Sequence, residues 1–118
     1  RRRKLAKIYS RELHHTLLKL PQEKTNCRHV FHLYVVRHPK RDLIIKKLKN
    51  KKIQVNINYP FPIHKMQAYK NMVCNNCDCL TVTEKNAREI FSLPLYPKLK
   101  VSEVLKISKI LRKILLKI

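Results

Sequence analysis

The residues best suited to chemistry in this chain lie together in a proline-rich stretch, residues 58–64, which reads NYPFPIH. Tyr59 offers a phenol and His64 an imidazole, which hydrogen-bond polar ligands, and the imidazole exchanges protons near neutral pH. The prolines between them restrict φ and favour extended neighbours. This combination predicts a stiff loop that presents both rings to a ligand. The same residues are also typical of a purely structural role, in which Tyr59 packs in a core and His64 caps the start of a helix.

A second group of reactive side chains, Cys74, Cys77 and Cys79, falls in the run CNNCDC. Two thiolates at C-x2-C spacing can hold zinc or an iron–sulfur cluster, or can form a redox pair. A structural zinc site needs four ligands, and the remaining cysteine, Cys27, is remote in sequence and is not part of a second knuckle. Cysteines in a surface loop without a metal are the simplest interpretation, so no metal site is assigned.

The formal net charge is +21 over 118 residues, from 28 Lys and Arg against 7 Asp and Glu. Such an excess favours polyanionic partners. The basic residues are mostly lysines spread along every predicted helix, whereas a nucleic-acid interface gathers Arg and aromatics on one face. A solvated surface is therefore the preferred interpretation. The chain has no glycine, so a Gly-rich phosphate loop is excluded, and positive φ is expected at asparagines such as Asn50, Asn71, Asn75 and Asn76.

Hydrophobic periodicity predicts the elements that must position these groups. Apolar residues at helical spacing predict an amphipathic helix over residues 1–20. A run of β-branched and aromatic residues predicts a strand at 30–36, and strict alternation predicts a half-buried strand at 53–59. Residues 65–70 are expected to form one or two helical turns, and two prolines predict extended backbone over 92–97.

Three more helices are expected, each with a side-chain cap: 43–50 with Asp42, 83–91 with Thr83, and the C-terminal helix with Ser102. The C-terminal helix alternates Lys with Ile and Leu, which is also typical of a cationic membrane-surface helix, but packing of its apolar face on the sheet is the simpler interpretation. Two strands and four helical segments predict one α/β (α+β) domain with a small sheet covered by helices. Neither a secretory leader nor an apolar run of ~20 residues is visible, so a cytoplasmic protein without membrane contact is expected.

The order of these segments resembles the C-terminal domain of the DegT/StrS family of sugar aminotransferases. These are fold-type I enzymes that use pyridoxal phosphate to aminate keto-sugars attached to nucleotides. Residues 29–37 (HVFHLYVVR) resemble the family pattern H-x-x-H-L-Y-V-V-R, and residues 58–64 resemble H-Y-P-x-P-L-H. Arg41-Asp42-Leu43, together with Leu48, resemble the family pattern R-D-x-L…L. Thr83-Glu84 and Ala87, followed by residues 92–97, resemble T-E-x-x-A…S-L-P-L-Y-P.

The resemblance runs from about Leu5 to the C-terminus, and it implies a single C-terminal small domain over residues 1–118. In it a helix over 1–20 leads into an α/β core over 28–118, with a small antiparallel or mixed sheet covered by helices, as in the small domain of fold-type I pyridoxal phosphate aminotransferases. The large pyridoxal-phosphate-binding domain of such enzymes has no counterpart in this sequence.

In such enzymes the segment that matches residues 58–64 reaches into the active site. The resemblance therefore implies that Asn58, Tyr59 and His64 contact a nucleotide-sugar substrate. The lysine that forms the Schiff base and the carboxylate that pairs with the pyridine nitrogen belong to the large domain. Pyridoxal phosphate is thus expected in the full-length family and not in this chain, which should be inactive alone. A partner chain carrying the large domain, or a homodimer, would complete the site.

The departures from the family pattern also carry information. Asn58 stands where the family has His, and residues 48–53 (LKNKKI) stand where it has L-x-x-x-G-I. The cysteine run replaces a loop that usually contains Gly. Loss of glycines suggests a separated or decaying remnant of an aminotransferase, a hypothesis that an in-frame open reading frame upstream would refute. One alternative function is a module that binds polyanions or nucleic acid, of which nucleic acid is disfavoured. The other is an interaction module that binds metal through Cys74, Cys77 and Cys79.

Overall fold

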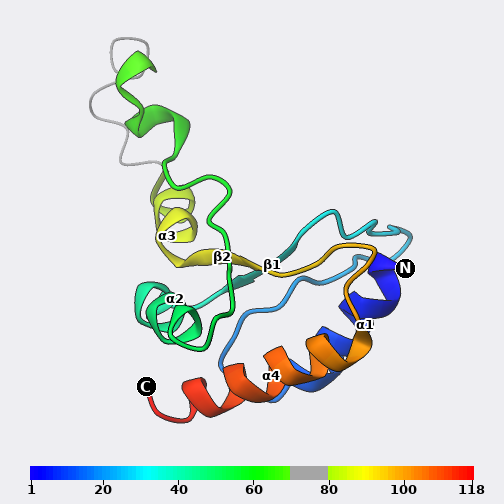
Figure 1. Cartoon of the computed structure of the whole chain (residues 1–118). Coiled ribbons are helices and arrows are strands. Elements are labelled where there is room, and N and C mark those ends of the chain that lie inside the picture. The colour runs from blue at the N-terminus through cyan, green and yellow to red at the C-terminus, as the bar shows by residue number, and fades with distance from the viewer. Residues whose placement is uncertain (70–79) are drawn as a thin grey trace.

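The computed structural model describes residues 1–69 and 80–118. Within them the chain forms four α-helices and one antiparallel pair of strands, with two short 3-10 turns (Figure 1). The elements are α1 (Arg2–Leu13), β1 (Tyr34–Arg37), α2 (Arg41–Lys49), η1 (Ile63–Lys65), η2 (Gln67–Tyr69), α3 (Thr81–Glu89), β2 (Ile90–Leu93) and α4 (Val101–Leu115). The α+β class and the small antiparallel sheet covered by helices are confirmed.

Helix α4 packs against α1 and α2, and it carries much of the hydrophobic core. Its buried residues include Val104, Ile107, Leu111 and Ile114, which share one face as helical spacing predicts. The apolar face of α4 was expected to pack on the sheet, whereas it packs mostly on the helices α1 and α2. Because this face is covered, the membrane-surface alternative is not supported. Among the described residues, no helix is both long and apolar enough to cross a bilayer.

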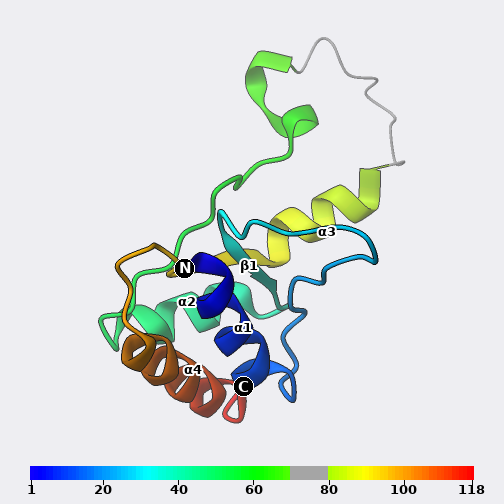
Figure 2. The same cartoon turned by 90° about the vertical axis from the view of Figure 1, so that its right-hand side faces the viewer.

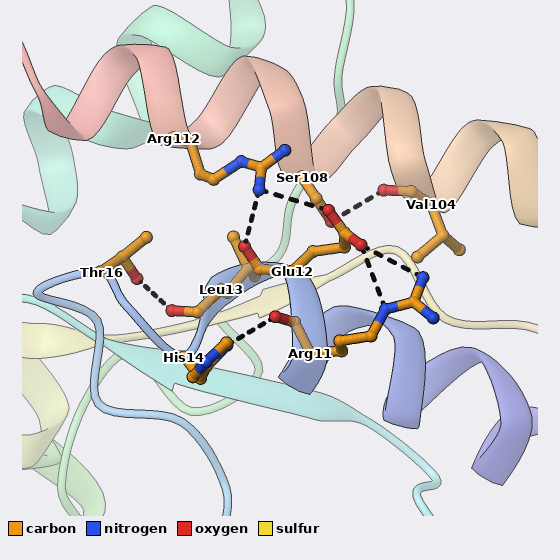
Figure 3. A network of polar contacts seen from close by, with 8 residues as sticks. All are labelled: Arg11, Glu12, Leu13, His14, Thr16, Val104, Ser108 and Arg112. Atoms are coloured by element: carbon orange, nitrogen blue, oxygen red, sulfur yellow. Dashed lines mark hydrogen bonds and ion pairs between the residues drawn. The ribbon is translucent and has the colours of Figure 1, made fainter.

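Polar contacts at the edge of this core join α1 to α4 (Figure 3). The carboxylate of Glu12 accepts from Arg11 at 3.2 Å on one oxygen and lies 3.3 Å from the Arg112 guanidinium on the other. The hydroxyl of Ser108 is fully buried, but it donates to the carbonyl of Val104 at 2.8 Å, so its burial leaves no unpaired group. Of these contacts, the pair of Arg112 and Glu12 joins the two helices.

Helix α1 ends at Leu13, well short of the expected residue 20. Both the backbone N–H and the hydroxyl of Thr16 donate to the Leu13 carbonyl, at 3.0 and 2.6 Å, which closes a tight turn. Lys19 and Arg37 then exchange backbone hydrogen bonds at 3.0 Å, so this part of the chain is extended beside β1. Leu17 is 81% exposed as a result, and its place in the helical stripe was wrongly predicted.

The second strand of the sheet is β2, not the predicted strand at 53–59. β1 and β2 pair in antiparallel register, with Tyr34 opposite Leu93 and Val36 opposite Phe91. Phe91, Ser92 and Leu93 are all buried, so burial does not alternate along β2. Extended backbone was predicted only from residue 92, and the helix predicted over 83–91 extends only to Glu89.

Residues 53–59 keep the predicted alternation but make a single bridge among the described residues, in which Asn56 and Ser92 exchange backbone hydrogen bonds of 3.3 and 2.7 Å. The same antiparallel register would pair Gln54 with Pro94 and Asn58 with Ile90. Proline has no N–H to donate, and the N–H of Ile90 already bonds to the carbonyl of Asn86 at the end of α3. Both further ladder steps are therefore blocked.

The predicted side-chain caps were wrong at all three helices. Lys40, Leu80 and Lys100 occupy the N-cap positions of α2, α3 and α4. At α4 the helix start is closed instead by the Glu103 carboxylate, which accepts from the Lys100 N–H at 2.9 Å. Asp42 lies in the first turn of α2, where a negative charge still favours the positive end of the helix dipole.

Positive φ occurs among the described residues at Asn26 (64°), Phe31 (52°) and Lys52 (58°), whereas Asn50 has φ of −63° and is helical. The expectation for Asn50 was therefore wrong, and Asn71, Asn75 and Asn76 lie outside the described residues. β1 begins at Tyr34 and not at the predicted residue 30. The reason is the left-handed conformation of Phe31, which interrupts the extended backbone.

Candidate functional site

The candidate site is the proline loop, residues 58–65, which leads from the bridge at Asn56 into the turn η1. Both views show this region and α3 standing away from the paired helices α1 and α4 (Figures 1 and 2). Pro62 has φ of −62° and ψ of 147°, which is the extended geometry that proline favours. The turn itself is closed by backbone hydrogen bonds from Lys65 to the Pro62 carbonyl and from Met66 to the Ile63 carbonyl.

The first end of the proline loop is tethered to β2. The hydroxyl of Ser92 donates to the Asn58 side-chain oxygen at 2.8 Å, beside the backbone bridge between Asn56 and Ser92. Ser92 is buried in the middle of β2, so it is a fixed point for this contact. Asn58 therefore acts here as an acceptor that holds the loop to the sheet.

The second end is tethered to α3 through one carboxylate. His64 Nε2 lies 3.0 Å from Glu84 Oε1, and Lys65 Nζ lies 3.1 Å from the same oxygen. Because an ionised carboxylate only accepts, Nε2 carries the proton in this contact. The guanidinium of Arg88 lies 3.9 Å from the other oxygen. The hydrogen bond from His64, followed by that from Lys65, holds the pKa of the Glu84 carboxyl below its usual range.

Between the two tethers the loop exposes apolar rings. Tyr59 is 74% exposed and Phe61 is 65% exposed, whereas the His64 side chain is only 11% exposed. A shallow groove of about 640 Å³ lies here, and its lining combines the loop with the inner side of α3. The lining includes Tyr59, Phe61, Met66, Leu80, Ala87 and Ile90. The groove is mostly apolar, and the polar side chains in its lining are Tyr59, His64, Thr83 and Asn86.

The three predicted contact residues thus differ in what they can do. Tyr59 is open to a ligand, His64 faces Glu84, and the Asn58 side chain faces Ser92. The structure places them on one short loop and leaves their role as substrate contacts a prediction. Sequence reasoning missed Glu84 and Ser92 as partners of the loop, and Glu84 entered it as part of the Thr83-Glu84 motif and not as a contact of His64.

A partly buried ion pair supports the base of α3. Arg37 Nη2 lies 3.0 Å from Glu89 Oε2, and this hydrogen bond holds the pKa of the Glu89 carboxyl below its usual range. Arg41 donates to the carbonyls of Ala87 and Ile90 at 2.7 and 3.4 Å, which satisfies backbone acceptors where the helix ends. The element that carries Glu84 is therefore fixed to β1 and α2.

The described residues do not fit pyridoxal phosphate. A Schiff base needs a lysine in an enclosed site, with a carboxylate for the pyridine nitrogen. No described lysine is buried, and the one buried carboxylate among the described residues, Glu89, pairs with Arg37. No step of amine transfer is assigned to this chain. No group of three potential metal ligands occurs in the described residues, while Cys74, Cys77 and Cys79 lie outside them.

Comparison with known proteins gives consistent matches. A family model described as the DegT/DnrJ/EryC1/StrS aminotransferase family matches residues 1–112. The chain is 48% identical over 83 residues to the dTDP-3-amino-3,4,6-trideoxy-alpha-D-glucose transaminase of Micromonospora megalomicea subsp. nigra, covering 70% of this chain and 22% of that protein. It is 33% identical over 104 residues to the dTDP-3-amino-3,6-dideoxy-alpha-D-galactopyranose transaminase of Aneurinibacillus thermoaerophilus, covering 88% of this chain and 28% of that protein.

Among solved structures, the chain is similar to S. venezuelae DesV in complex with a ketimine intermediate. The TM-score is 0.90 at 30% identity, and the match covers 96% of this chain and 30% of that chain. The chain therefore spans less than a third of the length of these relatives.

Proposed function

Because the chain belongs to the DegT/DnrJ/EryC1/StrS aminotransferase family, we propose that it supplies the substrate-contacting loop of a nucleotide-sugar aminotransferase. In this proposal Asn58, Tyr59 and His64 lie at the nucleotide-sugar site, and the chain is not catalytic alone. Pyridoxal phosphate and its lysine belong to a large domain outside these residues. A partner chain carrying that domain, or a homodimer, is part of the same proposal. A cytoplasmic location is part of the same proposal.

The observation that carries the proposal is the exposed Tyr59 on a loop held at both ends. Its hydroxyl can donate to or accept from a sugar or diphosphate oxygen, and the groove beside it offers apolar surface to a sugar ring or base. A prearranged loop loses little conformational entropy when a ligand binds, which favours affinity. Two curated relatives are named as acting on dTDP-linked amino sugars, so a dTDP-sugar is the first ligand to test.

The test is a titration of the isotope-labelled chain with dTDP-glucose and, in parallel, UDP-glucose, followed by amide chemical shifts. We expect shifts that saturate at Tyr59 and His64. Tyr59→Phe removes one hydroxyl and should weaken binding about two- to tenfold, the value of one hydrogen bond. Tyr96→Phe is the matched control, because Tyr96 is also exposed but lies outside the proline loop, and it should leave the affinity unchanged.

Shifts confined to other surfaces, or none at all in a folded sample, would contradict the proposal. An equal loss of affinity in both Tyr variants would contradict the assignment of Tyr59. A difference between the dTDP and UDP ligands would identify the nucleotide that the site prefers.

A further inference from the structure

Two segments of the chain that are about twenty residues apart in sequence meet at Glu84. The end of the proline loop contributes His64 and Lys65, and the first turn of α3 contributes the carboxylate between them. Both nitrogens lie within 3.1 Å of the same oxygen, Oε1. Such a shared acceptor fixes the position of two consecutive residues of the loop with one side chain.

A role at the start of helix α3 does not by itself explain the contacts that the Glu84 side chain makes. An acidic residue in the first turn favours the helix dipole wherever its side chain points, and α3 has no side-chain hydrogen bond at its N-cap. The Glu84 carboxylate instead faces cations on both oxygens, with Arg88 at 3.9 Å from Oε2. The Glu84 side chain is 27% exposed and that of His64 is 11% exposed, whereas the Lys65 side chain is 57% exposed, so the His64 side of the contact is the sheltered one.

The backbone between the two tethers has few freely rotating dihedrals. Ser92 holds the loop at Asn58, and Glu84 holds it at His64 and Lys65. Pro60 and Pro62 have fixed φ, and each restricts the residue before it, namely Tyr59 and Phe61. We therefore expect a displacement at the Glu84 end to reach Tyr59.

We propose that Glu84 is a positioning residue, which holds the proline loop through His64 and Lys65 so that Tyr59 is presented in one orientation. The presentation of Tyr59 to a ligand rests on the proposed function, whereas the tethering of the loop by Glu84 does not. Neutralising Glu84 would remove the acceptor shared by both loop residues and would leave the tether at Asn58 as the remaining fixed end.

The position of the loop should depend on pH in a definite direction. Glu84 faces His64 and Lys65 from η1 and Arg88 from its own helix, and its carboxyl pKa is lowered in the fold. A lowered pKa means that the tether is fully present above the carboxyl's ordinary pKa and is lost as the pH falls through the folded-state value. The loop should therefore loosen on acidification.

The test is amide hydrogen exchange at Lys65 and Met66, whose N–H groups close η1, in the whole 118-residue chain. Glu84→Ala should accelerate exchange there about two- to fivefold, as expected for loss of a partly exposed ion pair. Glu84→Gln keeps an oxygen that accepts from His64 and should be intermediate. Glu12→Gln, the same substitution at the α1–α4 contact, should leave both amides unchanged.

A pH profile separates positioning from general stability. After correction for intrinsic rates, wild-type exchange at Lys65 and Met66 should rise as the pH falls through the Glu84 pKa. The rise should be smaller in Glu84→Gln, where the Glu89–Arg37 pair at the base of α3 is the acid-sensitive contact that remains. Equal exchange in Glu84→Ala and wild type would overturn the proposal. The same acceleration in Glu12→Gln would do so too, since it would show global loosening.

The titration of the preceding subsection distinguishes the two proposals. Faster exchange in Glu84→Ala with no nucleotide-sugar shifts in wild type would support the tether and reject the substrate site. Ligand shifts that persist at full affinity in Glu84→Ala, with unchanged exchange, would support the substrate site and reject the tether.

Discussion

At the scale of single residues, the absence of glycine has a local cost at Lys52. Residues 48–53 stand where the family has L-x-x-x-G-I, and Lys52 occupies the Gly position with φ of 58°. A side chain in the left-handed region crowds its own backbone at a cost of roughly 1–2 kcal/mol, which glycine avoids. The backbone bonds from Lys52 to Lys49 and from Ile53 to Leu48 require this conformation to end α2.

Lys52→Gly should therefore stabilise the chain. The relief of strain is partly offset by the greater entropy of glycine in the unfolded state, so we expect a gain of about 0.5–1 kcal/mol in the free energy of unfolding. Urea denaturation followed by circular dichroism measures this. The control Lys46→Gly, at an exposed helical position of α2, should lose about 1 kcal/mol. Losses of similar size in both variants would show that Lys52 is not strained.

At the scale of elements, α4 demonstrates how one helix carries both core and surface. Leu111 is completely buried, whereas Leu116, just beyond the last turn, is 87% exposed. The two leucines are five residues apart, so their backbone environments are similar but their contacts are opposite. Arg112 joins this helix to α1 through Glu12 (Figure 3).

Leu111→Ala should cost about 2–5 kcal/mol of unfolding free energy, because it removes buried methyl groups and leaves a cavity against α1 and α2. Leu116→Ala should change stability by less than about 0.5 kcal/mol, since its side chain is already in water. Thermal and urea denaturation of both variants measure the difference. A large loss at Leu116 would indicate that its side chain is covered in solution, for example by a second copy of the chain.

At the scale of the whole molecule, the charge of +21 is distributed and not concentrated. The ion pairs of the described residues use few of the lysines, as the rarity of acidic residues requires. The candidate site lies on α3 and the proline loop, away from the helices α1 and α4 that carry many of the basic side chains (Figures 1 and 2). Charge alone therefore predicts attraction to polyanions without selectivity.

Binding to duplex DNA should accordingly be weak and steeply dependent on salt, with affinities within about twofold for two unrelated sequences of equal length. Fluorescence anisotropy over a series of salt concentrations measures both properties. A strong preference for one sequence that persists at high salt would favour the nucleic-acid-binding alternative over the aminotransferase-derived function.

The amino-acid sequence determined those features that depend on local periodicity and on motif identity. Three features could be predicted from the sequence alone: the buried face of α4, the alternation along residues 53–57, and the family. Each depends on a local periodicity or on a sequence motif. The proline loop was readable for the same reason, since Pro60 and Pro62 restrict the backbone wherever they occur.

Only the tertiary structure decided which segments meet. The choice of β2 over residues 53–59 depended on burial of both faces of β2 and on the missing N–H of Pro94, which are properties of the neighbours. The tethers of the loop likewise join residues that are 34 and 20 positions apart, Asn58 with Ser92 and His64 with Glu84. No local pattern encodes such pairs, because their partners are chosen by the packing of α3 and β2 on the rest of the chain.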